Sequence, residues 1–286
     1  MIDLHTHSNY SDGLYEPAQV IENAVRDGLS AVALCDHDCT WGLEEAKQRA
    51  KELNIDFIPG IELTVSTEND PDHADEIHML GLFIKPTEHL EDIHARSKKA
   101  KDAYSFSLAE AMRKYCALPV YVENMRQKFH GAISMGAFGE YMVQEGMIEK
   151  FTDRKKITKQ LVEEGKMIKK PEFGIQAEEA VEAIHEAGGL AILAHPYRMK
   201  LDDAALSERL KKFKAQGVDG IECHYTNYGD TTMEQIKKSL RMAAALGFLI
   251  SGGSDYHKDK PKGRFQGHTG VPSDLLTTLK RASLAR

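Results

Sequence analysis

Three side chains that can bind a metal ion lie close together near the start of the sequence, in "IDLHTHSNYSDG" at residues 2–13. His5 and His7 are two positions apart at the end of a predicted strand, so their side chains point to the same face. A turn through the polar residues that follow can bring Asp12 back toward them. Two imidazoles and a carboxylate in this arrangement are typical ligands of a divalent cation.

Further ligand-type residues recur where other predicted strands end. Taken alone, each has an ordinary explanation: a single buried histidine is usually a hydrogen-bonded core residue, and Asp36 could cap the next helix. Burying all of them together without a cation would be costly for every charge, which favours a metal centre. Besides Asp36, the residues are His37, Glu62, His78, His195, Asp255 and His257.

The positions of these residues follow from a regular alternation of predicted helices and strands. Buried strands are predicted at 31–36, 56–63, 76–84, 190–195, 218–224 and 248–255, and amphipathic helices lie between most of them. Such alternation indicates a parallel sheet, and the number of units predicts an α/β barrel. In a barrel of this kind the carboxyl ends of the strands converge on one mouth, where active sites lie.

Residues 88–172 interrupt the alternation with charged helix-forming segments and no convincing buried strand. We expect a helical insertion, or cap domain, over the mouth of a barrel built from 1–87 and 173–286. The histidines in this insertion, including His94, are expected to face solvent.

The composition excludes several classes of protein. The 286 residues carry 44 acidic and 37 basic side chains, a formal net charge of −7, so nothing favours stable binding to duplex nucleic acid. No long apolar run or signal peptide is present, which predicts a cytoplasmic protein with no membrane partner. Four cysteines without Cys-x-x-Cys spacing predict reduced thiols in the interior.

The ordered motifs closely resemble those of the PHP (polymerase and histidinol phosphatase) superfamily of metal-dependent phosphoesterases. The segments "DLHTHSNYSDG", "LCDHD", "PGIE", "HMLG", "AHP" and "SGGSDYH" carry the resemblance, which covers about residues 1–86 and 175–270. Within the superfamily, the chain is most similar to a stand-alone bacterial subgroup containing a 3',5'-nucleotide bisphosphatase and a 5'-3' exoribonuclease. The resemblance implies a distorted (β/α)7 barrel and two or three divalent metal ions, Mn, Fe or Zn, at its mouth.

The resemblance also implies a role for individual residues. It assigns His5, His7, Glu62 and Asp255 to a first metal ion, Glu62, His78 and His195 to a second, and Asp12, His37 and His257 to a third. Glu62 would bridge two ions, and His195 or His257 could additionally protonate the leaving group. Candidate substrate-binding residues are Asn9, Arg198, Arg264 and His224; the subgroup often has arginine where this chain has Asn9.

The expected activity is hydrolysis, by metal-activated water, of small nucleotides such as 3',5'-bisphosphates or of the 5' ends of short oligonucleotides. Two alternatives stay open on the sequence. One is histidinol-phosphate phosphatase or another small-molecule phosphomonoesterase. The other is a non-catalytic, metal-binding regulatory module, against which the presence of all nine implied ligands argues.

Overall fold

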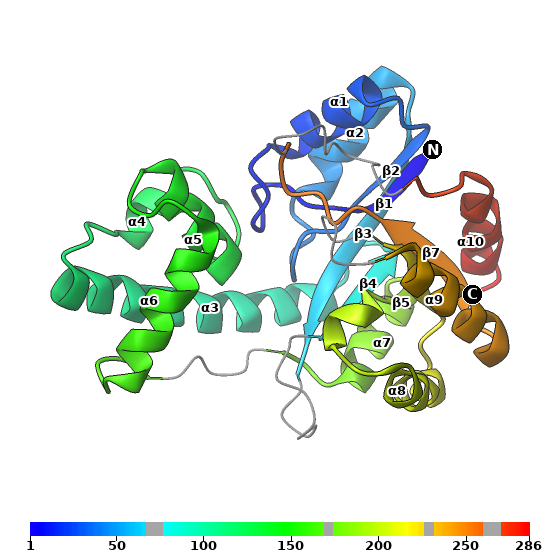
Figure 1. The fold of residues 1–286 in the computed structure, drawn as a ribbon. Helices are drawn as coiled ribbons and strands as arrows, with labels where there is room; N and C mark the ends of the chain where they lie inside the picture. Colours follow the sequence, from blue (N-terminus) through cyan, green and yellow to red (C-terminus); the bar gives the residue numbers. More distant parts are fainter. Residues whose placement is uncertain (67–76, 169–173, 226–231, 260–269) are drawn as a thin grey trace.

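A seven-stranded sheet, curved into a nearly closed barrel, forms the centre of the molecule (Figure 1). The computed structural model describes residues 1–66, 77–168, 174–225, 232–259 and 270–286. The strands are hydrogen-bonded in chain order. They are β1 (Ile2–Thr6), β2 (Ala31–Leu34), β3 (Asp56–Val65), β4 (Ile77–Leu82), β5 (Leu190–Leu193), β6 (Gly220–Tyr225) and β7 (Leu249–Gly253). The predicted α/β barrel, with the seven strands that the resemblance implies, is therefore confirmed.

The alternation of helices and strands predicts a parallel sheet, but the sheet is mixed. β4 runs antiparallel to both β3 and β5, whereas the other neighbouring pairs are parallel. A parallel pair needs a crossover connection, and no helix is described between β3 and β4. The reversal has a functional consequence: the start of β4, which carries His78, lies at the mouth where the parallel strands end.

Helices cover the outside of the barrel (Figure 1). α1 shows how the sequence builds them: Pro17 occupies its first turn, and Val20, Ile21 and Ala24 form its buried face. Burying an aliphatic side chain such as Ile21 stabilises the fold by roughly 1.5–3 kcal/mol. The barrel helices are α1 (Pro17–Arg26), α2 (Leu43–Leu53), α7 (Ala177–Glu186), α8 (Asp203–Ala215), α9 (Met233–Leu246) and α10 (Asp274–Leu284), with a 3-10 turn, η1, at Pro196–Met199. The prediction missed α10.

The barrel is drawn together where the chain after β7 meets the end of β1. The backbone N–H of His7 donates to the carbonyl of Tyr256 over 2.8 Å, and that of Tyr256 donates to the carbonyl of His5 over 3.3 Å. A Cβ atom at Gly253 would lie only 2.3 Å from the Cβ of His5. Only glycine permits this close approach, which explains one glycine of the "SGGSD" motif.

Between β4 and α7 the described residues form helices, as predicted: α3 (Glu88–Cys116), α4 (Val122–Met125), α5 (Met135–Gln144) and α6 (Phe151–Glu163). We call α3–α6 the helical segment. It has an apolar cluster of its own, which includes Leu108, Phe129 and Phe138. Figure 1 shows that it extends to one side of the barrel, with the first part of α3 close to the strands. That it forms a separate cap domain stays a prediction.

Two smaller predictions were wrong. Cys116, at the end of α3, is exposed, although the other three cysteines are buried and all four are free thiols. His94 is buried instead of solvated, because α3 packs its side chain under the loop after β2. Among the described residues, no helix is long and apolar enough to cross a membrane.

Candidate metal centre

The structure brings all nine sequence-predicted ligands to one mouth of the barrel. Strands carry His5, Glu62 and His78, and the other six lie on the loops that follow or precede them. Two of the loop ligands have left-handed backbone conformations, His195 with φ 30° and Asp255 with φ 53°. Such conformations are unfavourable for residues other than glycine and often occur at functional sites.

The first group of ligands comprises His5, His7, Glu62 and Asp255, all buried. Nε2 of His5 and Nε2 of His7 each lie 3.3 Å from Oε2 of Glu62. Oδ1 of Asp255 lies 3.6 Å from Nε2 of His5 and 3.2 Å from Nε2 of His7. These four side chains match the set that the resemblance implies for the first ion.

The second group meets at the other oxygen of Glu62. Nδ1 of His78 lies 3.0 Å and Nε2 of His195 lies 3.1 Å from Oε1 of Glu62. The two imidazole nitrogens are 3.3 Å apart. Each oxygen of Glu62 therefore faces a different set of histidines, an arrangement that allows the carboxylate to bridge two ions.

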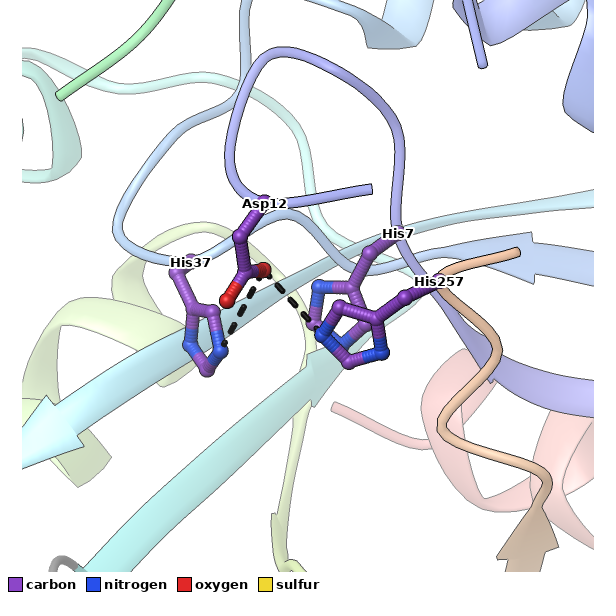
Figure 2. A group of neighbouring side chains, drawn as sticks. All are labelled: His7, Asp12, His37 and His257. Carbon is purple, nitrogen blue, oxygen red and sulfur yellow. Dashed lines mark ion pairs between the residues drawn. The ribbon is translucent and has the colours of Figure 1, made fainter. Parts of the chain in front are cut away.

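The third group, which we call the outer group, consists of His7, Asp12, His37 and His257 (Figure 2). Its carboxylate oxygen, Oδ1 of Asp12, lies 3.1 Å from Nε2 of His257 and 3.8 Å from Nε2 of His37. His37 and His257 are only partly buried, so this group is the part of the centre nearest to solvent. It contains the three implied ligands of the third ion, with His7 as a fourth.

The electrostatics of the centre keep its carboxylates ionised. Burial alone would raise the pKa of Glu62, but the surrounding imidazoles, first those of His37 and His5, hold it well below its usual range. In the same way, His257 and His5 outweigh the burial of Asp255 and lower its pKa. Ionised carboxylates in a buried site are suited to bind cations.

Two histidines of the centre are held neutral by burial. The pKa of His37 is lowered to about 4 and that of His195 to about 3, so both imidazoles offer a lone pair at neutral pH. His257 differs, because Asp12 and Asp255 overcome the effect of burial and raise its pKa to about 9. A proton on His257 thus balances the negative charge of Asp12 and Asp255, a role that a bound metal ion would also fill.

Unsatisfied polar atoms test whether these residues fit metal ions. Five buried side-chain atoms of the centre make no hydrogen bond, although buried polar atoms nearly always do. All five belong to implied ligands: Nε2 of His5, Nε2 of His7, Oδ1 of Asp12, Nδ1 of His37, which lies 3.1 Å from Oε2 of Glu62, and that oxygen itself. Imidazole nitrogens and carboxylate oxygens are the donors that Mn, Fe and Zn accept, so the residues fit a multinuclear centre.

Sequence reasoning missed Glu222 and Tyr225, which lie on either side of the candidate substrate-binding residue His224. The pairing of β6 with β7 is irregular between Glu222 and His224, and such a bulge re-aims side chains. Glu222 and Tyr225 consequently face the centre, where the Tyr225 hydroxyl donates to Oδ2 of Asp255 over 3.0 Å. His224 lies outside the three ligand groups. Burial lowers its pKa, and the carboxylate of Asp274 in α10 partly opposes this effect. The strand pattern around "IECHY" indicated an inward position without resolving which residues occupy it.

Asp36 does not cap α2. Its carboxylate accepts hydrogen bonds from the backbone N–H and hydroxyl of Ser8, over 2.8 and 2.6 Å, and from the hydroxyl of Ser11 over 2.6 Å. These bonds fold back the loop after β1, and thereby place Asp12 near His7. Asp36 is a supporting residue of the centre.

The predicted substrate-binding residues have different positions. Arg198, in η1, is half exposed, with Nη1 3.6 Å from Oδ2 of Asp255, so its guanidinium lies at the rim of the centre. Asn9 is buried and donates from Nδ2 to Oε1 of Glu16 over 2.7 Å. Arg264 lies outside the described residues.

Comparison with known proteins agrees with this geometry. Residues 3–190, more than half of the chain, match the PHP domain family. The chain is 30% identical to a 5'-3' exoribonuclease of Haemophilus influenzae, over 89% of each protein. It is 31% identical to a 3',5'-nucleoside bisphosphate phosphatase of Chromobacterium violaceum, over 94% of this chain and 91% of that protein.

A solved structure supports the same relationship. It shows a Chromobacterium violaceum protein described as an amidohydrolase, with bound sulfate and no metal. The two structures superpose with a TM-score of 0.81 at 27% identity, covering 98% of this chain and 96% of the other. Fold, ligand groups and sequence similarity lead to one conclusion: the chain belongs to the PHP family and is a metal-dependent phosphoesterase.

Proposed function

We propose that the enzyme hydrolyses phosphate esters of small nucleotides, such as 3',5'-bisphosphates, or the 5' ends of short oligonucleotides. The observation that carries this proposal is the guanidinium of Arg198 beside Asp255, at the rim of a centre with three ligand groups. A second, cationic contact next to a phosphate-hydrolysing centre suits a substrate with more than one phosphate. Relatives of similar length that act on a nucleoside bisphosphate or on RNA support the same class of substrate.

In the proposed mechanism, the nine ligands would hold two or three divalent ions, Mn, Fe or Zn, and Glu62 would contribute to binding two of them. Bound ions of this kind lower the pKa of water to near neutrality and neutralise charge on phosphoryl oxygens. Glu62, His195 and His257 would be the residues closest to the reacting atoms. His257 could also protonate a leaving group whenever its imidazole is not itself a ligand.

The chain's own groups shape the rest of the reaction. The nearby thiol of Cys35 is a poor nucleophile, because burial raises its pKa, and it donates to the carbonyl of Leu4. The hydroxyls of Ser8 and Ser11 are committed to Asp36. Arg198 would bind a phosphate that is not being hydrolysed, and thereby orient the ester bond.

A substrate panel tests the proposal. Purified enzyme is assayed, with its metal content measured as isolated, on a nucleoside 3',5'-bisphosphate, a 5'-phosphorylated short RNA, histidinol phosphate and a generic phosphomonoester. The inactive control is Glu62→Gln. The proposal requires the highest kcat/KM on the bisphosphate or the RNA.

Each other result has a clear meaning. A preference for histidinol phosphate or the generic monoester would replace the nucleotide assignment by the alternative phosphomonoesterase. Metal-loaded protein that hydrolyses none of the four would indicate the non-catalytic binding module.

A further inference from the structure

Three ligands of the outer group lie in loops that the helical segment contacts. Asp12, His37 and His257 lie in the loops after β1, β2 and β7. By contrast, Glu62 and His78 lie within β3 and β4, where antiparallel pairing fixes the backbone: Glu62 pairs with Leu80 and His78 with Thr64. A loop needs support from elsewhere to hold a ligand in place.

The loop that carries His37 is held by α3. Its next residue, Asp38, is buried in a left-handed conformation with φ 50°. From α3, Lys101 Nζ and Ser97 Oγ donate to Oδ2 of Asp38 over 2.5 and 2.7 Å, and Nδ1 of His94 lies 2.8 Å from its carbonyl oxygen. One residue next to the ligand thus receives three contacts from one helix.

Asp38 also ties this loop to the strand that carries Glu62. Its backbone N–H donates to the carbonyl of Glu62 over 2.9 Å. Its carboxylate accepts from the backbone N–H of Thr64 over 2.7 Å and from the Thr64 hydroxyl over 3.0 Å. Asp38 therefore links α3 to β3, so the packing of α3 affects the distance between His37 and Glu62.

The loop that carries Asp12 lies against α5. A Cβ atom built on Gly136, near the start of α5, would be only 1.9 Å from Oδ2 of Asp12. Just before α5, a Cβ on Gly131 would be 1.8 Å from the carbonyl oxygen of Tyr10, and His130 donates its backbone N–H to the carbonyl of Asn9. The segment thus touches both the ligand and the backbone that precedes it.

The loop that carries His257 is also joined to α5. Lys258, the residue after the ligand, forms an ion pair with Glu140. Asp12, His37 and His257 are thus contacted, directly or through the neighbouring residue, by α3, α5 or the loop just before α5.

We infer that the helical segment positions the outer group, so that the metal ion held there depends on the packing of α3 and α5 against the ligand loops. Gly136 and Lys101 are positioning residues, and neither is a ligand. The inference rests on the proposed metal centre. It makes the segment part of the metal site, in addition to any role as a cap.

The sharpest test is Gly136→Ala. Alanine suits a helix better than glycine, so α5 keeps its structure, but the new methyl group must displace the Asp12 carboxylate. Binding of Mn²⁺ to metal-free protein is followed by equilibrium dialysis with elemental analysis. We expect the site formed by the outer group to require about 10- to 100-fold more Mn²⁺ for half-saturation. The affinity of the other sites should stay the same. Gln144→Ala, an exposed substitution on the same helix, should bind as the wild type does.

Lys101→Met tests the same inference from α3, because it keeps the apolar stem and removes the charge that holds Asp38. Loss of the same ion is expected, with recovery in Lys101→Arg and no effect in Lys99→Met, an exposed position of α3. Circular dichroism of the metal-free proteins separates a positioning effect from unfolding. If Lys101→Met unfolds, Gly136→Ala and Lys101→Arg still decide.

The outcomes are distinct. Wild-type stoichiometry and affinity in Gly136→Ala, or in folded Lys101→Met, would overturn the inference. An equal loss of every ion would also overturn it, because the segment would then support the barrel as a whole. Failure of the wild type itself to bind Mn²⁺ would instead contradict the proposed metal centre.

Discussion

Nδ1 of His5 lies 3.0 Å from Oε1 of Glu222, and the other carboxylate oxygen of Glu222 accepts the backbone N–H of His195 over 2.8 Å. One buried carboxylate therefore orients two predicted ligands, one in β1 and one in the loop after β5. With Nδ1 beside Glu222, Nε2 of His5 faces Oε2 of Glu62. Support of this kind tunes the position and basicity of metal-binding histidines.

Glu222→Gln is expected to weaken metal binding about 10- to 100-fold. A glutamine amide has one acceptor oxygen, so it cannot accept from both His5 and His195. Titration calorimetry with Mn²⁺ on metal-free protein measures the effect, and Glu182→Gln, exposed on α7, is the control. Unchanged affinity in Glu222→Gln would mean that the barrel alone orients the two histidines.

Glu62→Gln should reduce hydrolysis by several orders of magnitude and lower the metal content. The substitution keeps the volume of the side chain but removes the charge that two ions would share. Activity and elemental analysis are measured on the same preparation, beside Glu110→Gln on the exposed face of α3. A variant with near-normal turnover and full metal content would refute the bridging role.

Arg198→Ala should lower kcat/KM on a nucleoside bisphosphate about 10- to 150-fold, which corresponds to a charge-assisted contact of roughly 1.5–3 kcal/mol. A substrate that lacks the second phosphate should lose much less. Arg198→Lys keeps the charge without the planar fork and should be intermediate. The control is Arg241→Ala, on the exposed side of α9. Equal losses on both substrates would remove Arg198 from the specificity site.

Low pH should weaken the contacts that Asp102 makes between α3 and the rest of the helical segment. This carboxylate accepts the backbone N–H of Ile133 over 2.9 Å and contacts Lys98 and Arg126 over 2.8 and 2.6 Å. Burial would raise its pKa, but these three donors lower it below the usual value. A depressed folded-state pKa stabilises the fold above the unfolded-state value, about 3.9, and this stabilisation disappears as the pH falls through the folded-state pKa.

Asp102→Asn should therefore lower the free energy of unfolding by about 1.5–3 kcal/mol at neutral pH, and by less in acid. Urea unfolding of the metal-free protein at both pH values measures the difference. Asp92→Asn, whose side chain is 65% exposed in its pair with Arg96, should change it by less than about 1 kcal/mol. The same loss for Asp102→Asn at both pH values would show that the carboxylate charge is not responsible.

The sequence by itself determined the chemistry of the site and the class of fold. Ligand-type residues such as His5, His7 and Glu62 follow or end apolar strand patterns, and strand alternation alone directs them to one face. The helix and strand order was legible because most elements have strong local periodicity. The helical segment was recognisable because charged helix-forming residues there interrupt the alternation, without a convincing buried strand.

Only the tertiary structure decided which residues meet. The reversed direction of β4 brings His78 to the mouth, and this depends on pairing with β3 and β5. A bulge in β6 turns Glu222, in place of His224, toward the centre. The contact of Lys101 with Asp38 joins positions far apart in the chain. Strand direction, bulges and buried ion pairs arise from long-range packing, which no local pattern encodes.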